Sequence, residues 1–233
     1  DSWNGKFVQM GNGGFAGRIP WGTMLLGLSR GYAVAGTDDG HQSNDATDAS
    51  WAPGHPEKVR DFGWRSVKTT TDTAKAIVAA YGTAAKRNYF FGCSDGGREA
   101  LMTAQRYPAD FDGIVAGAPA WAWTRMVSVG GLAAKDQVAP GGNLPPAKLP
   151  ALQAAALKAC GAGKTYIAAP ESCTFDPVVL QCKGKETNDC LTPQQVAVTR
   201  TIYHGRPDTI AGGILPGLEP GAEAGGDSWA AWG

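Results

Sequence analysis

The chain has 233 residues, 43% of them hydrophobic, and its 21 basic and 21 acidic side chains balance to a net charge of zero. This length predicts one large globular domain, or one domain and part of a second. The charge balance argues against a nucleic-acid or membrane-surface partner, since no excess of like charge is available to drive either association.

Strands and helices are predicted to alternate from Lys6 to about Ala120. In chain order, we expect a strand at 6–10, a helix at 23–29, a strand at 32–37, a polar loop at 38–63, a helix at 67–81, a strand at 88–91, a helix ending at 107 and a strand at 113–116. The helix at 67–81 has apolar residues at helical spacing and stops at Gly82. Such alternation predicts an α/β core over residues 1–120, with a parallel sheet and right-handed crossovers.

One pentapeptide, Gly92-Cys93-Ser94-Asp95-Gly96, has the form G-x-S-x-G and lies between a predicted strand and a predicted helix. In that context the serine is expected on a strained strand-to-helix corner, with its hydroxyl exposed as a nucleophile. The backbone N–H that follows it, at Asp95, would point toward the oxygen of a bound carbonyl. The alternative is an ordinary serine in a glycine-rich turn.

A second glycine-rich segment, residues 11–15, directly follows the first predicted strand. A loop in this position supplies the second oxyanion donor in hydrolases of this architecture, and its glycines let the backbone approach a substrate. A phosphate-binding loop would need a different glycine spacing or a P-loop lysine, and neither pattern is present. A plain tight turn is the remaining alternative.

From Trp121 onward the chain is rich in Ala, Gly, Pro and Cys, and we interpret residues 121–233 as an inserted lid with helices at 147–159 and 193–203. Two local disulfides, Cys160–Cys173 and Cys182–Cys190, would hold this region together and imply an oxidising compartment. The fifth cysteine, Cys93, is either a buried thiol or has its partner outside these residues. No Cys-x-x-Cys pair or nearby histidine suggests a zinc site.

Several segments together resemble the tannase and feruloyl esterase family, which also includes the hydrolase of mono(2-hydroxyethyl) terephthalate. They are residues 3–7, 11–17, 37–41, 92–98, 107–120, 175–177, 190–193 and 216–217. The resemblance implies an α/β-hydrolase core with Ser94 as nucleophile, and backbone N–H groups of Gly14 and Asp95 as the oxyanion hole. It also implies that Cys93 matches a cysteine disulfide-bonded next to the catalytic histidine, and that residues 121–233 match the first part of a lid over the acyl pocket.

The sequence departs from the family pattern in two places. The lid loop that begins at Cys160 lacks the aspartates with which the family binds calcium, so that calcium site is expected to be lost. The family's acid and base follow the lid, whereas here His41 and His55 precede Ser94 and His204 lies at a predicted helix end. We therefore expect the chain to be the middle of a longer protein, truncated at both ends.

These observations predict a secreted serine carboxylesterase that acts on small aromatic acid esters of the feruloyl or galloyl type. It would need no cofactor or metal for catalysis. One alternative is a non-catalytic relative, a module that binds phenolics or carbohydrate, and another is a terephthalate monoester hydrolase. The sequence makes no prediction about the oligomeric state.

Overall fold

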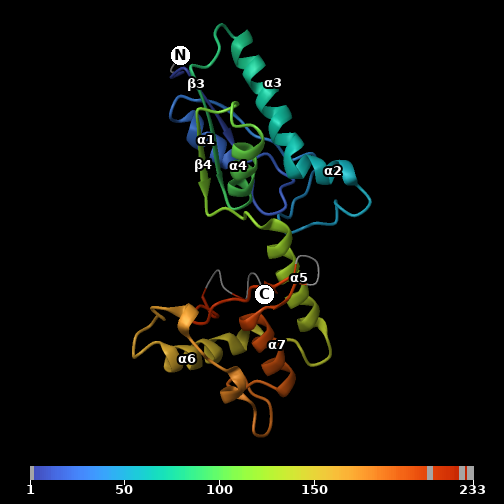
Figure 1. Cartoon of the computed structure of the whole chain (residues 1–233), viewed down its shortest axis with the longest axis vertical. Coiled ribbons are helices and arrows are strands. Elements are labelled where there is room, and N and C mark those ends of the chain that lie inside the picture. The colour runs from blue at the N-terminus through green and yellow to red at the C-terminus, as the bar shows by residue number, and fades with distance from the viewer. Residues whose placement is uncertain (1–2, 209–211, 226–228, 230–233) are drawn as a thin grey trace. The chain divides into compact units, whose positions relative to one another are not determined.

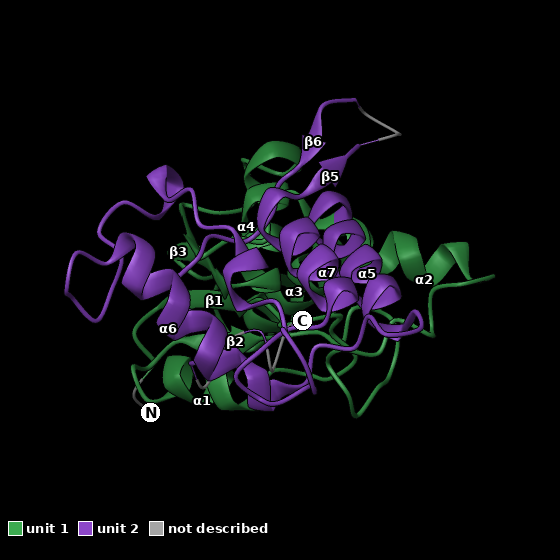
Figure 2. Cartoon of the chain, turned by 90° about the horizontal axis from the view of Figure 1, so that it is seen from below, with its two compact units in different colours: residues 1–123 green, residues 124–233 purple. Residues whose placement is uncertain are grey.

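The computed structural model describes residues 3–208, 212–225 and 229. The chain divides into two compact units, Asp1–Trp123 and Thr124–Gly233, which we call unit 1 and unit 2 (Figure 2). The sequence-based boundary lay between residues 120 and 121. None of the helices in the described ranges is long and apolar enough to cross a membrane.

Unit 1 is built on a four-stranded parallel sheet (Figure 1), which confirms the predicted α/β class. Its strands are β1 (Lys6–Met10), β2 (Ala33–Ala35), β3 (Arg87–Cys93) and β4 (Gly113–Gly117), in the order β2-β1-β3-β4. Because all four strands run in the same direction, their carboxyl ends meet at one edge of the sheet. That edge is where ligands bind in sheets of this kind.

The two faces of β1 are covered by different helices, because successive side chains of a strand point to opposite sides. Helix α1 (Trp21–Leu28) covers one face, where a Cβ added to Gly27 would come within 2.9 Å of the side chains of Met10 and Val34. Helices α3 (Ser66–Ala80) and α4 (Asp95–Arg106) lie on the side of the sheet reached by Phe7 and Gln9. The core there consists of Phe7, Val67, Phe90, Ala100 and Phe111.

The predicted loop at 38–63 is wrong in its last part, which is helical. Helix α2 (Pro56–Arg60) leads into a π-helical turn, Asp61–Arg65, and then directly into α3. The guanidinium of Arg98 donates to the carbonyls of Phe62 at 2.9 Å and Gly63 at 3.3 Å. This turn is therefore supported by a distant arginine, which the local sequence does not reveal.

Unit 2 consists mainly of helices. They are α5 (Trp123–Val138, whose first residue belongs to unit 1), α6 (Leu149–Cys160) and α7 (Pro193–His204), with short 3₁₀ helices at Pro146–Lys148, Pro170–Ser172 and Pro177–Leu180. A short antiparallel pair, β5 (Arg206–Pro207) and β6 (Ile214–Leu215), follows α7. Helices α6 and α7 match the predicted positions, whereas α5 and the β5–β6 pair were not predicted.

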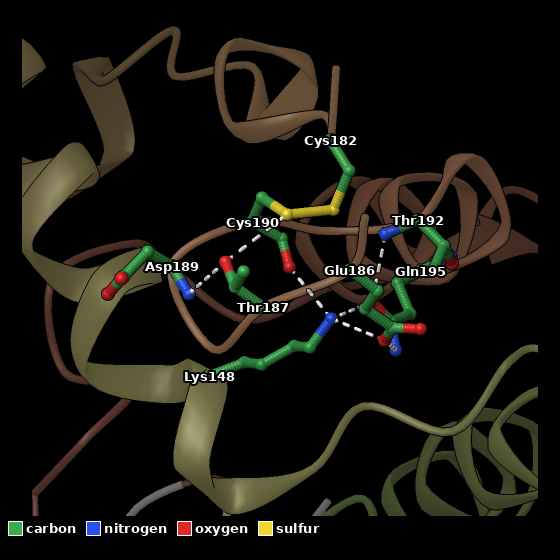
Figure 3. The surroundings of a disulfide bond; sticks show 8 residues. All are labelled: Lys148, Cys182, Glu186, Thr187, Asp189, Cys190, Thr192 and Gln195. Carbon is green, nitrogen blue, oxygen red and sulfur yellow. Dashed lines mark hydrogen bonds and ion pairs between the residues drawn. A yellow bond between two sulfur atoms is a disulfide. The ribbon is translucent and has the colours of Figure 1, made fainter. Parts of the chain in front are cut away.

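Both predicted disulfides of unit 2 are present, Cys160–Cys173 and Cys182–Cys190. Beside the second one, the buried side chain of Lys148 donates from Nζ to Glu186 Oε1 at 2.6 Å, to Cys190 O at 2.7 Å and to Gln195 Oε1 at 2.7 Å (Figure 3). The buried ammonium of Lys148 therefore donates to three acceptors, and these bonds connect the segment before α6 to the loop between Cys182 and Cys190 and to α7. The bonds replace the water that Lys148 loses on burial.

Candidate active site

Ser94 lies at the corner between the end of β3 and the start of α4, with an exposed side chain and backbone angles φ 60° and ψ −117°. Residues other than glycine rarely adopt this conformation, which costs of order 1–3 kcal/mol and persists only where surrounding contacts impose it. Here the N–H of Ser94 donates to Gly117 O at 3.1 Å, and its carbonyl accepts from the N–H groups of Arg98 and Ala120. The structure thus contains the strained corner that the sequence predicted.

The corner also requires a residue without a side chain at its base. A Cβ built on Gly92 would lie 2.0 Å from the carbonyl oxygen of Gly96, so α4 can begin this close to β3 only when residue 92 is glycine. The first glycine of the motif is therefore explained by the contact between the strand and the first turn of the helix, and the second by the backbone of Asn12, which a Cβ on Gly96 would meet at 2.9 Å.

The segment after β1, Gly11–Gly14, which we call the oxyanion loop, is bound to the same helix turn. The backbone of Asn12 accepts from Gly96 N–H at 2.8 Å and donates to Glu99 Oε2 at 3.0 Å. The Asn12 side chain donates to Thr37 O at 2.8 Å. Asn12 was not predicted as a site residue, yet it is the point at which the loop is fixed.

The backbone N–H groups of Gly14 and Asp95 make no hydrogen bond within the part of the chain that the structure describes. Asp95 is the first residue of α4, where a helix leaves its N–H groups unbonded and attracts negative charge. Gly14 has φ +59° and follows Gly13, whose own N–H donates to the side chain of Asn12. Both predicted oxyanion residues thus keep a donor available.

The side chain of Asp95, unlike its backbone N–H, is fully buried and pairs with Arg98. Arg98 Nη2 donates to Asp95 Oδ2 at 3.3 Å, and its guanidinium lies 4.3 Å from the ring centre of Phe62. Burial raises the pKa of Asp95 to about 6, and the hydrogen bond from Arg98 opposes that shift. The carboxyl group of Asp95 is therefore held by Arg98, and its backbone N–H makes no hydrogen bond among the described residues.

Two further buried acids, Asp39 and Glu99, lie beside Asp95, with one oxygen of each of the three within 4.8 Å of the others. This is the only cluster of potential metal-ligating side chains among the described residues, and the positive charge beside it comes from Arg98, so we assign no metal to it. Asp39, Glu99 and Arg98 were not predicted as site residues. A signal existed, because Asp39 follows β2 at the same sheet edge and Glu99 lies one helical turn after Asp95.

Each histidine of the chain is accounted for by other contacts or lies in unit 2. Buried His41 stacks on Trp51 with ring centres 4.0 Å apart, and its Nε2 is 2.8 Å from Phe15 O. His55 Nδ1 lies 3.0 Å from Pro53 O, and His204 is the last residue of α7. Cys93 is a free thiol among the described residues, and because it is exposed, the alternative of a buried thiol is wrong.

The loop between Cys160 and Cys173 does not fit the calcium site of the resembling family. Between these cysteines the only carboxylate is Glu171, while Lys164 places its ammonium 5.2 Å from the ring centre of Tyr166. Calcium needs six to eight oxygen ligands, mostly carboxylates and carbonyls, and a single acid beside a lysine offers a poor set.

Comparisons with known proteins agree with this geometry. The family model for tannase and feruloyl esterase matches residues 1–225. The chain is 42% identical to an uncharacterized esterase of Xanthomonas campestris over 99% of the chain and 41% of that protein. It is 35% identical to the mono(2-hydroxyethyl) terephthalate hydrolase of Piscinibacter sakaiensis over 87% of the chain and 40% of that protein.

A solved structure, feruloyl esterase B from Aspergillus oryzae, superposes on the whole chain with a TM-score of 0.84 at 27% identity, and 48% of that structure is covered. The chain therefore spans less than half the length of the relatives it matches. A family match over nearly all of the chain and the geometry of the Ser94 corner lead to the same assignment: the chain belongs to the tannase and feruloyl esterase family.

Proposed function

We propose that this chain supplies the nucleophile and the oxyanion hole of a secreted serine carboxylesterase that hydrolyses aromatic acid esters of the feruloyl or galloyl type. The observation that carries the proposal is the exposed Ser94 in its left-handed corner, with unbonded N–H groups at Gly14 and Asp95. The two disulfides of unit 2 support an oxidising compartment.

The reaction proceeds in two acyl-transfer steps. A general base takes the proton of the Ser94 hydroxyl, and Oγ attacks the ester carbonyl to form a tetrahedral intermediate. The N–H groups of Gly14 and Asp95 stabilise its oxyanion, and the alcohol leaves with the proton that the base returns. Water then attacks the acyl-enzyme by the same route, which releases the aromatic acid and restores the serine.

We assign the general base to a histidine in the remainder of the esterase. Within the described structure no hydrogen bond joins a histidine to Ser94. In unit 1, His41 is buried against Trp51 and Phe15. A serine hydroxyl is a weak nucleophile without such a base, so residues 1–233 alone are expected to hydrolyse aryl esters near background.

The test compares the 233-residue chain with a longer chain that extends to the full length of the relatives, using methyl ferulate, methyl gallate and mono(2-hydroxyethyl) terephthalate. We expect turnover only in the longer chain, with loss of at least ~10³-fold in kcat on Ser94→Ala. Ser29→Ala, which removes an exposed hydroxyl bonded only to Leu26 O, is the matched control. Turnover by the short chain that disappears on His204→Ala would overturn our assignment of the base.

The same assay separates the alternatives. A non-catalytic relative would bind ferulic acid without hydrolysing any of the three esters in either length. A terephthalate specialist, which the identity to the Piscinibacter sakaiensis hydrolase favours as second candidate, would show its highest kcat/KM on the terephthalate ester.

A further inference from the structure

Two buried carboxyl groups next to the oxyanion loop, those of Asp39 and Glu99, form no ion pair with any residue in the described ranges. Asp39 is 0% exposed and Glu99 is 1% exposed, and one carboxylate oxygen of each lies within 4.8 Å of the other. Asp39 Oδ2 and Glu99 Oε1 receive no N–H or O–H donor from any described residue. Two carboxylates buried this close together, each with an oxygen that has no donor, repel each other when both are ionised, and a proton on one of them removes the repulsion and supplies a donor.

The other oxygen of each group holds a segment of the site. Glu99 Oε2 accepts the Asn12 N–H at 3.0 Å, and Asp39 Oδ1 accepts the Ser66 hydroxyl at 2.8 Å. Asn12 begins the turn that presents the Gly14 N–H, and its carbonyl is bound by Gly96 in the first turn of α4. The pair thus connects the oxyanion loop, the loop after β2, and the first turns of α3 and α4.

We propose that Asp39 and Glu99 share a single proton, carried by Glu99, and act together as positioning residues that hold the oxyanion loop against the Ser94 corner. Neither residue touches the substrate. The positioning role rests on the proposed esterase function, whereas the shared proton does not.

The charged groups that face the pair favour this arrangement. Burial raises the pKa of Glu99 well above its usual value, and the neighbouring charge of Asp39 raises it further. Burial also raises the pKa of Asp39, while the hydrogen bond from Glu99 opposes that shift. Asp95 adds a like charge and Arg98 an opposite one, with Arg98 bonded directly to Asp95. Loss of the remaining proton would leave two negative charges side by side. Their repulsion would weaken the hydrogen bond between Glu99 and the Asn12 N–H.

Glutamine at position 99 provides a matched replacement for the protonated acid. Its amide can donate to Asp39 Oδ2 while its oxygen accepts the Asn12 N–H, so Glu99→Gln keeps both bonds without a titratable group. Glu99→Met has a similar size and loses both bonds. Glu57→Gln removes an exposed acid that bonds only to Arg60 and Arg65, and it serves as the control.

The first measurement uses the 233-residue chain and does not depend on activity. Infrared spectroscopy at neutral pH should show a protonated carboxyl band that Glu99→Gln removes and Glu57→Gln leaves. Amide hydrogen exchange at Asn12 should stay within about twofold of the parent in Glu99→Gln and accelerate about tenfold or more in Glu99→Met. No protonated band at neutral pH, or unchanged exchange at Asn12 in Glu99→Met, would overturn the proposal.

The second measurement uses the longer esterase. Glu99→Met should lower kcat by about 10²–10³ with little change in KM, because the oxyanion donor is displaced while substrate binding remains. Glu99→Gln should have the kcat of the parent enzyme. In the parent, kcat should fall at alkaline pH as the shared proton is lost, and in Glu99→Gln this fall should be absent. A parent esterase that hydrolyses no aryl ester would count against the proposed function alone, since the infrared and exchange results still decide the pair. An active Glu99→Met enzyme with the parent's kcat would contradict the positioning role.

Discussion

Units 1 and 2 are held together by different kinds of contact. In unit 1, Asp39, Asp95, Arg98 and Glu99 form one connected group at the sheet edge, where helix and loop backbones converge on Ser94. In unit 2, the two disulfides hold loops between helices, and Lys148 is bonded beside one of them. Unit 1 therefore depends on noncovalent polar contacts that also shape the site, whereas unit 2 depends in part on covalent ones.

This difference predicts which changes alter the candidate site and which alter stability alone. Variants in the buried polar group of unit 1 should affect both Ser94 chemistry and folding. Variants in the disulfide-bonded loops of unit 2 should loosen that unit and leave the hydrogen bonds around Ser94 unchanged.

The largest effect is expected from Arg98→Met. Arg98 is the bonded partner of fully buried Asp95 and also donates to the carbonyls of Phe62 and Gly63. Leaving a buried charge unpaired typically costs about 3–5 kcal/mol of unfolding free energy. Denaturant unfolding measures this loss, and Arg87→Met, whose arginine is exposed in its pair with Asp112, should cost less than about 1 kcal/mol.

The same variant should show a defined pH dependence. Without Arg98 the pKa of Asp95 rises further above 6, so its protonation relieves the unpaired charge at low pH. The stability lost by Arg98→Met should therefore be smaller at pH 5 than at pH 8. A loss that is equal at both pH values would show that Asp95 is not the group left unpaired.

The second prediction concerns adjacent glycines in the oxyanion loop. Gly14→Ala places a Cβ 2.2 Å from Ala46 O at a φ of +59°, so the donor must move. Loss of one oxyanion donor typically lowers kcat by about 10²–10³. Gly13→Ala meets nothing within 4 Å and should retain kcat within a few-fold, as measured on aryl esters in the longer chain. If the two variants lose activity equally, the Gly14 N–H is not a donor.

The third prediction separates the two units. Replacing Cys160 and Cys173 by serine opens a loop closed across a sequence separation of 13, and removing such a disulfide typically costs about 2–4 kcal/mol. Amide exchange should accelerate in α6 and α7, while the protection of β1 and β3 stays unchanged. Equal acceleration in β1 would contradict the independence of the units. The Cys182–Cys190 pair closes a shorter loop, across a sequence separation of 8, and its removal should cost less.

The smallest effect is expected from Lys148→Met, which leaves Cys190 O without its buried donor, while Gln195 Oε1 keeps the N–H of Thr192. Because Glu186 is half exposed and can return to water, the cost should be about 1–3 kcal/mol, the range for unsatisfied neutral groups. Thermal unfolding measures it. Lys183→Met, at an exposed lysine in the same loop region, is the control and should be neutral.

Much of unit 1 could be predicted because its signals are local. The strand at Lys6–Met10 was predicted at its observed bounds. The Ser94 corner could be predicted because its glycines indicate a close contact between strand and helix. The disulfides of unit 2 were predicted because each joins cysteines near in sequence.

The missed features depend on distant contacts or on residues that oppose the structure they adopt. The π-helical turn at Asp61–Arg65 contains Gly63 and is supported by Arg98, far along the chain. Helix α5 includes Gly130 and Gly131, each of which lowers helix propensity by about 1 kcal/mol. Asp39 and Glu99 come close only when the sheet brings the loop after β2 beside α4, and this depends on contacts between segments far apart in the sequence.

The backbone of Ser94 has a consequence for attempts to improve this protein by selection. Glycine would adopt φ 60°, ψ −117° with little strain, so Ser94→Gly would remove much of the ~1–3 kcal/mol of strain in the folded state. The added flexibility of the unfolded chain would offset about 0.5–1 kcal/mol of that gain in unfolding free energy. A library screened for heat resistance alone would therefore enrich Ser94→Gly, a sturdier protein without its nucleophile. Any screen for a more durable esterase must score turnover in the same round as survival.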